Sequence, residues 1–507
     1  MQTFAAIDIG SNSCRLKIGR VVQHRLRIVH EDREVTRLGG SVFESGIVSP
    51  EAMAATLRTL KRFHKAVQSH GTDKVRAVAT SAMRDARNSR VFLAWVRDET
   101  GWEVEIISGL EEGRLIHRGV VENEAGAGGR CLLVDIGGGS CEITLSEHKR
   151  IHETMSLPLG AVRLTQEFVR SETPGKDEIR RLRQFIHREL RRATRRIHAE
   201  RVRLVIGTSG TAAALSDAGR ALGKGRASKE LVPTQTVRRL TAKLTKMKTG
   251  ERSAVPGIGP KRSEIIVAGA HVLAEILEGF ALPGFRYSPM GLRDGILAQM
   301  LAEQDPRASA HQEFERERRQ AVEEACRRYG IDPRQAEPVR QHAAQMFRDL
   351  AAVHELPAEY ETWLEAAALL RDIGKFLNHQ GYHRHAQYII ANSELYGFTP
   401  QQRVVTSAIA RYQGKSRPSP EGRTMRQVPP EEYEHVRRAV VLLRLAVALN
   451  QDRASDVLKV RVRVYPRRVL LELLPGRTGA ELELWSLRKE ADYFREVFGR
   501  ELFVALA

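Results

Sequence analysis

Two short segments of the sequence combine an aspartate with glycine, serine and asparagine in a way that suits phosphate chemistry. The first is Asp8-Ile-Gly-Ser-Asn-Ser13 and the second is Asp135-Ile-Gly-Gly-Gly-Ser140, each between two short apolar runs. Glycines let backbone N–H groups converge on an anion, and serine and asparagine add donors. The aspartate is positioned to bind a metal ion beside the phosphate. The sequence therefore predicts a repeated phosphate site formed by Gly10, Ser11, Asn12, Ser13, Gly137, Gly138, Gly139 and Ser140.

Other glycine-rich phosphate loops do not fit these two segments. Neither is followed by the Lys-Ser/Thr pair of a Walker loop, and neither carries G-x-G-x-x-G between a strand and a helix. A single segment of this kind would be equally compatible with a tight hairpin turn. The repetition, together with a third glycine-rich segment, favours a phosphate site. The third segment consists of Gly207, Thr208, Ser209 and Gly210.

The elements around these loops alternate between strand and helix as far as about residue 305. Apolar runs at 4–9 and 15–22 flank the first loop, and runs at 131–136 and 141–145 flank the second. A link of small residues at 125–129 separates the two halves. Alternation of this kind predicts an α/β architecture in two lobes.

The remainder of the chain has a different pattern. Residues 311–450 are mostly amphipathic helix, whereas 456–484 alternate in the manner of a small antiparallel sheet. We therefore expect four domains. They are an α/β lobe at 1–125, a second α/β lobe at 126–305, a helical domain at 306–452 and a small α+β domain at 453–507.

The charge of the chain predicts a polyanionic partner. The 507 residues carry a net charge of +19, from 81 Lys and Arg against 62 Asp and Glu. Such a balance suits nucleic acid, an anionic membrane surface or a phosphate-rich substrate, and charge alone does not choose among them. The arginine-rich segment 177–200 is interpreted as the solvated face of an amphipathic helix. With aromatic residues at 6% and no zinc finger or RNA-recognition signature, no specific nucleic-acid binding is predicted.

The cysteines and the apolar pattern predict a cytoplasmic protein. The four cysteines show no pairing motif and are expected to be reduced thiols. No signal peptide precedes the first apolar run, and no apolar window approaches the roughly 18 residues of a membrane span. The positive charge leaves peripheral membrane attachment open.

The loops resemble those of the exopolyphosphatase/guanosine pentaphosphate phosphohydrolase family, and the resemblance covers essentially the whole chain. It implies an α/β fold of two actin-like lobes, as in ribonuclease H, sugar kinases and heat-shock ATPases. It further implies an all-α HD-like domain, a small C-terminal α+β domain and a homodimer. The further matching motifs are Thr80-Ser-Ala-Met-Arg84, Ser108-Gly-Leu-Glu111-Glu112-Gly-Arg114 and Gly291-Leu-Arg293-Asp-Gly295.

The resemblance assigns catalytic roles to two residues. Hydrolysis of a phosphoanhydride needs a positioned water, a base for it and positive charge on the transferred phosphoryl group. Glu112 matches the glutamate that activates water in the family, although chemistry alone does not separate it from Glu111. Arg84 matches a motif arginine and would clamp a phosphate as a fixed fork. Arg15 and Arg293 are weaker phosphate-binding candidates.

The same resemblance implies a magnesium ion. Asp135 and Glu142 match the ion-binding acids of the family and would hold Mg²⁺ against phosphate oxygens, with Asp8 sharing the ion through water. The segment around Asp372 resembles the core of HD-type metal phosphohydrolases. There Arg371 stands where the first histidine should be, and its fixed charge would repel a metal.

The helical domain is therefore expected to bind a polyanion rather than to catalyse. The residues expected to line a channel are Lys375, His383, Arg384 and His385. A solvated, partly stacked helix face is an equal alternative for them.

The function predicted from the sequence is Mg²⁺-dependent, processive release of terminal phosphate from inorganic polyphosphate, with Glu112 activating water. The alternative is hydrolysis of guanosine pentaphosphate to the tetraphosphate at the same site. A kinase of the same superfamily and a non-enzymatic sensor of guanosine phosphates are the rivals from other classes.

Overall fold

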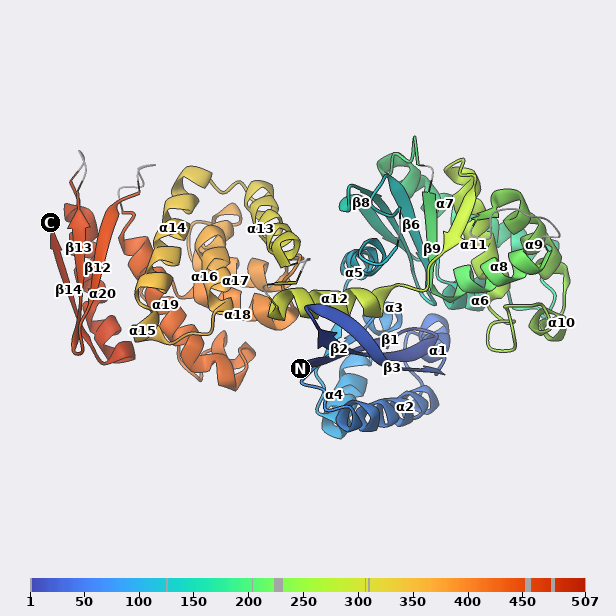
Figure 1. Ribbon diagram of the computed structural model, residues 1–507, viewed down its shortest axis with the longest axis horizontal. Coiled ribbons are helices and arrows are strands. Elements are labelled where there is room, and N and C mark those ends of the chain that lie inside the picture. The colour runs from blue at the N-terminus through green and yellow to red at the C-terminus, as the bar shows by residue number, and fades with distance from the viewer. Residues whose placement is uncertain are drawn as a thin grey trace. The chain divides into compact units, whose positions relative to one another are not determined.

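The computed structural model (Figure 1) divides into two compact units, Met1–His311 and Gln312–Ala507. Among the helices of the described residues, none has both the length and the apolar character needed to cross a membrane. The expected link at 125–129 and sheet at 456–484 begin at residues outside the described part of the chain. The described residues are 2–124, 126–202, 204–222, 231–305, 307–308, 311–451, 457–475 and 479–506.

The first lobe is a five-stranded sheet in the order β3-β2-β1-β4-β5. The first three strands of this order pair antiparallel, whereas β4 and β5 continue from β1 in parallel. The strands are β1 (Thr3–Ile9), β2 (Ser13–Val22), β3 (Arg25–Val35), β4 (Lys74–Ala79) and β5 (Val104–Ile106). The helices of this segment are α1 (Leu38–Ser45), α2 (Pro50–Ser69), α3 (Ser81–Asp85), α4 (Ser89–Thr100) and α5 (Gly109–Val121).

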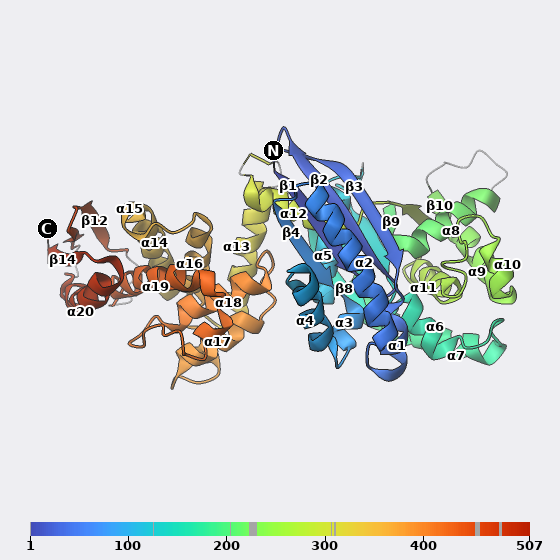
Figure 2. The ribbon, with the colours of Figure 1, turned by 90° about the horizontal axis from the view of Figure 1, so that it is seen from below.

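The central strand β1 is buried along its whole length because helices cover both faces of the sheet. Ala5 and Ile7 belong to the core cluster that includes residues of α2 and α4. Phe4 and Ala6 point the other way, into the cluster formed with α12 (Leu292–Gln304). Figure 2 shows α2 lying along the face of this sheet. Burial on both faces explains why β1 is continuously apolar up to Asp8.

The second lobe repeats this arrangement in a six-stranded sheet of order β10-β11-β9-β6-β7-β8. Strands β6, β7 and β8 pair antiparallel, and β9 and β11 continue from β6 in parallel. The strands are β6 (Cys131–Ile136), β7 (Cys141–Glu147), β8 (Arg150–Leu157), β9 (Leu204–Thr208), β10 (Leu231–Pro233) and β11 (Gly284–Tyr287). The helices are α6 (Ala161–Phe168), α7 (Lys176–Arg196), α8 (Ser209–Leu222), α9 (Thr234–Lys246), α10 (Thr249–Ser253) and α11 (Ile266–Gly279). The repeated topology confirms the expected pair of actin-like lobes.

The two lobes exchange a helix. Helix α5 packs on β7 and β8 of the second sheet, and α12 packs on β1, β2 and β3 of the first. The two helices meet at glycines, because a Cβ atom on Gly295 would lie 1.7 Å from the Leu115 carbonyl oxygen. One on Gly119 would lie 2.4 Å from the Gly291 oxygen. The lobe limits 1–125 and 126–305 stay a proposal, since each lobe takes a helix from the other segment.

The second unit combines a helical part and a small sheet around one apolar core. Strands β12 and β13 pair antiparallel as expected, but β14 joins β13 in parallel because α20 carries the chain back along the sheet. The HD-like character of the helices stays a prediction. The helices are α13 (His311–Arg328), α14 (Pro333–Asp349), α15 (Ala351–His354), α16 (Glu359–Leu370), α17 (Tyr382–Asn392), α18 (Pro400–Arg411), α19 (Tyr433–Ala448) and α20 (Glu481–Phe498). The strands are β12 (Lys459–Val464), β13 (Arg468–Leu474) and β14 (Glu501–Leu506).

The close approach of α5 and α12 predicts a stability cost for any side chain at Gly295. Gly295→Ala should lower the free energy of unfolding by about 3 kcal/mol, because the new methyl group meets backbone that cannot move aside. Urea denaturation followed by far-UV circular dichroism measures the change. Gly250→Ala in α10 is the matched control, since a Cβ atom there meets nothing within 4 Å. Equal stability of the two variants would contradict the packing described.

Candidate functional site

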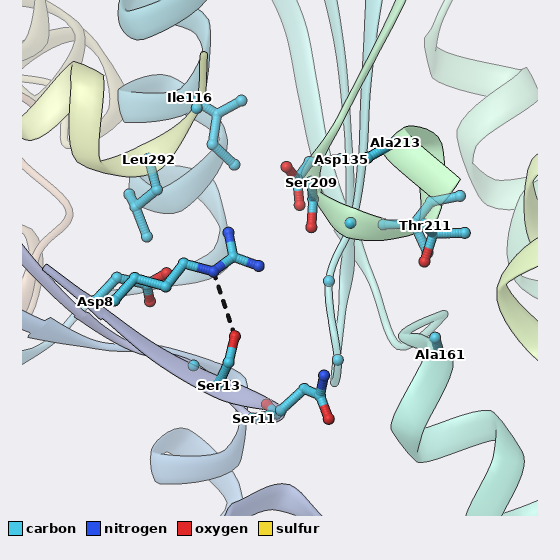
Figure 3. Close-up of a pocket in the computed structure, with 18 of the residues that line it drawn as sticks. Asp8, Ser11, Ser13, Ile116, Asp135, Ala161, Ser209, Thr211, Ala213 and Leu292 are labelled. Atoms are coloured by element: carbon cyan, nitrogen blue, oxygen red, sulfur yellow. Dashed lines mark hydrogen bonds between the residues drawn. The ribbon is translucent and has the colours of Figure 1, made fainter. Parts of the chain in front are cut away.

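A cavity of about 350 Å³ lies where the two glycine loops meet (Figure 3). Figure 3 shows Asp8, Ser11 and Ser13 of the first lobe facing Asp135 and Ser209 of the second across this cavity. The structure thus brings most of the predicted site residues together. Those that line the cavity are Asp8, Gly10, Ser11, Asn12, Ser13, Arg15, Glu112, Asp135, Gly137, Gly138, Gly139, Ser140, Ser209, Gly210 and Arg293.

The first loop is held so that its backbone donors stay available. The Gly10 N–H donates to the Ser13 carbonyl oxygen at 3.2 Å and closes the turn between β1 and β2. The Ser11 hydroxyl accepts from the Ala82 N–H at 3.1 Å, so the loop is anchored to α3. Within the described part of the chain, the backbone N–H groups of Ser11 and Asn12 have no acceptor. Such groups suit an anion.

The second loop repeats this arrangement. The Gly137 N–H donates to the Ser140 carbonyl oxygen at 3.0 Å, and the Gly138 oxygen accepts from the first turn of α6. The N–H groups of Gly138 and Gly139 have no acceptor among the described residues. The loops touch each other, since a Cβ atom on Gly138 would lie 3.0 Å from the Ser11 Cβ atom. Two sets of unused donors therefore meet in one place.

Glu112 lies on the wall of this cavity, in the first turn of α5. The Ser108 hydroxyl caps that helix by accepting from the Glu111 N–H at 3.1 Å. Arg84 Nη1 donates to Glu112 Oε2 at 3.0 Å, and Arg84 Nη2 lies 3.4 Å from the Ser140 hydroxyl. Glu111 instead pairs with Arg114 at 3.2 Å and is not among the described residues that line the cavity. Arg84 joins the acid on α5 to the second loop.

The Glu112 carboxyl suits proton transfer near neutral pH. Burial raises its pKa to about 7, with the charges of Asp8 and Asp135 adding to the rise and Arg84 opposing it. A carboxylate with a pKa in this range can both hold and release a proton under working conditions.

The two acids expected to hold a metal face the same side of the second sheet. Asp135 and Glu142 lie directly opposite each other on β6 and β7. Thr208 Oγ1 donates to Asp135 Oδ2 at 2.5 Å, and Ser156 Oγ donates to Glu142 Oε1 at 2.7 Å. Glu142 Oε2 is buried without a hydrogen-bond partner. Burial raises the pKa of both carboxyls, and a cation would relieve the cost of charging them.

These acids fit a magnesium ion whose remaining ligands would be water and the phosphate oxygens of the substrate. No group of three or more His, Cys, Asp or Glu side chains that could hold a metal is found in the described part of the chain. Mg²⁺ in phosphate sites is usually bound by one or two carboxylates, water and the substrate phosphates themselves. Asp8 lies across the cavity, where burial also raises its pKa.

Two arginines that the sequence analysis missed line the cavity. Arg33 pairs with Arg15 across β2 and β3, and the Arg262 guanidinium lies against the backbone of Gly210. Burial lowers the pKa of Arg33 to about 10 and of Arg262 to about 9, and neighbouring arginines add to the effect. Neither side chain has a hydrogen bond or ion pair to a described residue. With Arg293, they leave the cavity rich in positive charge.

Some predicted residues lie outside the cavity wall. Gly207 is in β9, where a Cβ atom would meet the Phe285 ring at 2.8 Å, and Thr208 reaches the site only through Asp135. Arg84 and Glu142 are also not among the described residues that line the cavity, although Arg84 contacts Glu112 and Ser140 of its wall and Glu142 accepts from Ser156.

The predicted channel residues belong to the second unit. Lys375 pairs with Asp372 at 3.0 Å and lies over the Tyr382 ring, and burial lowers the pKa of His383. Arg371 Nη1 donates to the Ala368 carbonyl oxygen at 2.7 Å. The channel residues that follow Tyr382 in α17, including Arg384 and His385, are half-buried or exposed.

The fold and the two facing glycine loops are typical of an actin-like protein that acts on phosphate groups. The chain belongs to the Ppx/GppA phosphatase family, whose model matches residues 17–304. A second model, described as Ppx/GppA phosphatase domain III, matches residues 317–491. The expected family is thereby confirmed, and with it a phosphatase.

Solved structures agree with this assignment. An exopolyphosphatase from Cytophaga hutchinsonii is 26% identical, with a TM-score of 0.56 over 60% of this chain and 98% of its own. The Aquifex aeolicus member of the Ppx/GppA family is 29% identical, with a TM-score of 0.50 over 60% of this chain and 99% of its own. An exopolyphosphatase-like protein is 28% identical, with a TM-score of 0.54 over 58% of this chain and 96% of its own.

The arginines of the cavity lead to a prediction about the binding of a short polyphosphate. Arg262→Met should weaken the binding of tripolyphosphate, measured by calorimetry, by about tenfold or more, because one charged hydrogen-bond donor is lost. Arg238→Met is the control, since Arg238 pairs with Glu278 on the surface of α9 and α11, outside this cavity. Equal weakening by the two substitutions would show that only overall charge matters.

Proposed function

We propose that this protein is a Mg²⁺-dependent exopolyphosphatase that removes terminal phosphate from inorganic polyphosphate. The observation that carries the proposal is Glu112, a buried carboxyl with a pKa raised to about 7, held by Arg84 beside two loops of unused backbone donors. A binding protein would have no use for a base at this position, whereas hydrolysis requires one.

The residues divide the work of hydrolysis between them. The N–H groups of Ser11, Asn12, Gly138 and Gly139 bind the non-bridging oxygens of the terminal phosphoryl group. Arg84 donates to the same group and holds Glu112 in place. Glu112 accepts a proton from water as the water oxygen attacks phosphorus, and the bond to the bridging oxygen breaks. Orthophosphate and a chain one unit shorter are the products.

The acids and the arginines of the cavity have separate tasks in this scheme. Asp135, Glu142 and Asp8 would hold Mg²⁺, which when bound neutralises negative charge on the phosphate oxygens. Arg15, Arg33 and Arg262 bind the next phosphates and compensate the charge left on the departing end. Arg15 and Arg262 are half-buried, which makes their charge more effective than it would be in water.

Distal parts of a long chain need further cationic contacts. We assign this role to Lys375, His383, Arg384 and His385 of the helical domain, which we take to be HD-like in fold and without metal. Several weak, salt-sensitive contacts of this kind would keep a shortened chain bound between rounds, which is what processive cleavage requires. The limits 306–452 and 453–507 and a homodimer are part of the same proposal.

Hydrolysis of guanosine pentaphosphate is a second candidate function, and the apolar part of the cavity lining favours it. Apolar residues line the cavity beside the arginines, among them Ala213, Ile265 and Met290. Such a wall suits a nucleoside better than a bare phosphate chain. Orthophosphate release from long-chain polyphosphate, compared with release from guanosine pentaphosphate with and without Mg²⁺, separates the two candidates.

Glu112 and its neighbour Glu111 provide a matched test. Glu112→Gln should lower the rate of orthophosphate release about a thousandfold, because the amide cannot accept the proton of the attacking water. Binding of tripolyphosphate should persist. Glu111→Gln, one residue away and paired with Arg114 instead, should keep nearly full activity. Substantial phosphate release by Glu112→Gln would refute the assignment.

The raised pKa of Glu112 predicts the pH dependence of the reaction. Below about pH 7 the carboxyl is protonated and cannot act as a base, so kcat/KM should fall by about tenfold per unit as the pH decreases. Arg84→Met should move this acidic limb to higher pH, because the Arg84 charge lowers the pKa of Glu112. An acidic limb near pH 4 would contradict the proposed base.

A further inference from the structure

Arg163, in the first turn of α6, joins the second phosphate loop to the first lobe. Arg163 Nε donates to the Gly139 carbonyl oxygen at 2.7 Å, and Nη2 donates to the Ser81 hydroxyl at 3.0 Å. Nη2 also forms an ion pair with Asp85. The guanidinium stacks over the Phe43 ring of α1, with 4.2 Å between Cζ and the ring centroid. One side chain thus contacts a loop of the second lobe and two helices of the first.

Each of these contacts is made to an element of the proposed active site. Ser81 and Asp85 are the first and last residues of α3, the helix that carries Arg84. Gly139 is in the loop whose Ser140 lies 3.4 Å from Arg84 Nη2. Phe43 lies against Gly139, because a Cβ atom there would be 2.5 Å from the Phe43 ring. Arg163 itself is not among the described residues that line the cavity.

Helix α3 needs such an anchor because it is only five residues long and has no side-chain cap. A helix of this length is not stable by itself, and its position depends on contacts from outside. The Ser11 hydroxyl holds its N-terminal end through the Ala82 N–H. Arg163 spans from one end of the helix to the other, on the side that faces the second loop.

Only an arginine can make this set of contacts. The planar guanidinium donates in several fixed directions while its face stacks on an aromatic ring. A lysine would keep the charge opposite Asp85, but its single nitrogen cannot reach the Gly139 carbonyl and the Ser81 hydroxyl in the same geometry.

We propose that Arg163 is a positioning residue that fixes α3 against the second phosphate loop and so sets the place of Arg84 beside Glu112. The inference rests on the proposed function, because it assumes that Arg84 and Glu112 act on substrate. Arg163 contributes to the reaction through Arg84 and not by touching the phosphate chain.

The test is steady-state phosphate release from long-chain polyphosphate by variants of the full chain. Arg163→Ala and Arg163→Lys should each lower kcat by about a hundredfold, because a displacement of about 1 Å at a catalytic group has this effect. KM should change by less than about threefold, since the cavity arginines are untouched. Asp85→Asn should lower kcat to a smaller extent.

The decisive measurement is made in a second background. If Arg163 acts through Arg84, then adding Arg163→Ala to Arg84→Ala should lower kcat by less than about twofold further. Arg130→Ala is the matched control, since Arg130 is as buried as Arg163 and also bonds backbone carbonyls and a carboxylate, at the far end of β6. It should leave kcat within about twofold in either background.

The possible results distinguish a failure of the inference about Arg163 from a failure of the proposed function on which it rests. Full additivity of Arg163→Ala and Arg84→Ala in an active enzyme would overturn the inference alone. Absence of phosphate release by the unaltered protein would overturn the proposed function and the inference with it. If Arg163→Ala does not fold, Arg163→Lys and Asp85→Asn decide, because Asp85 is partly exposed and its replacement removes only the ion pair. Unchanged kcat in both would also overturn the inference.

Discussion

The structure of the site depends on one steric constraint, which is the direct contact between two loops that begin different lobes. Gly138 approaches Ser11 so closely that an added methyl group would lie 3.0 Å from the serine Cβ atom. This contact leaves the free N–H groups of both loops facing one cavity. The next residue is packed more tightly still, because a Cβ atom on Gly139 would lie 2.5 Å from the Phe43 ring and from the Ser81 hydroxyl.

A second constraint follows from the burial of charge. Asp8, Asp135, Glu142 and Glu112 are all buried, and burial raises the pKa of each carboxyl. In the same cavity, desolvation and the charges of neighbouring arginines lower the pKa values of Arg33 and Arg262. Charging the buried carboxyls is costly to the folded protein without a ligand, and the proposed binding of a polyanion together with a cation would reduce this cost. On this proposal, ligand binding would therefore stabilise the folded protein.

The local features of the site could be predicted from the sequence, and the long-range ones could not. In the segments 8–13 and 135–140, the residues that form the turn are neighbours in the sequence. The sequence therefore predicts that Asp8, Asp135 and the loop residues bind phosphate. Arg33 was missed because its place beside Arg15 depends on the pairing of β2 with β3, where a shift of one residue reverses the side chain. Arg262 was missed because it arrives from a segment more than 50 residues after Gly210.

The same distinction applies to the fold. Alternation of apolar runs was sufficient for two α/β lobes, because each strand and helix carries its own period, whereas their actin-like character was implied only by the resemblance of the loops. The exchange of α5 and α12 between the lobes could not be predicted from the sequence, because the apolar face of a helix does not indicate which sheet it packs against. The parallel entry of β14 was also not anticipated, because parallel pairing depends on the return path through α20 rather than on the strand itself.

The two lobes are copies of one another in topology but not in electrical sign. The residue opposite the loop aspartate is Arg15 in the first lobe and Glu142 in the second. The duplicated strand pair has in this way acquired a basic residue in one lobe and an acidic residue at the equivalent place in the other. A linear chain of identical phosphates has no direction of its own, and both of its ends are equivalent. If inorganic polyphosphate is the substrate, as proposed, the protein alone sets the direction of binding, and whichever end enters first is the end that is cut.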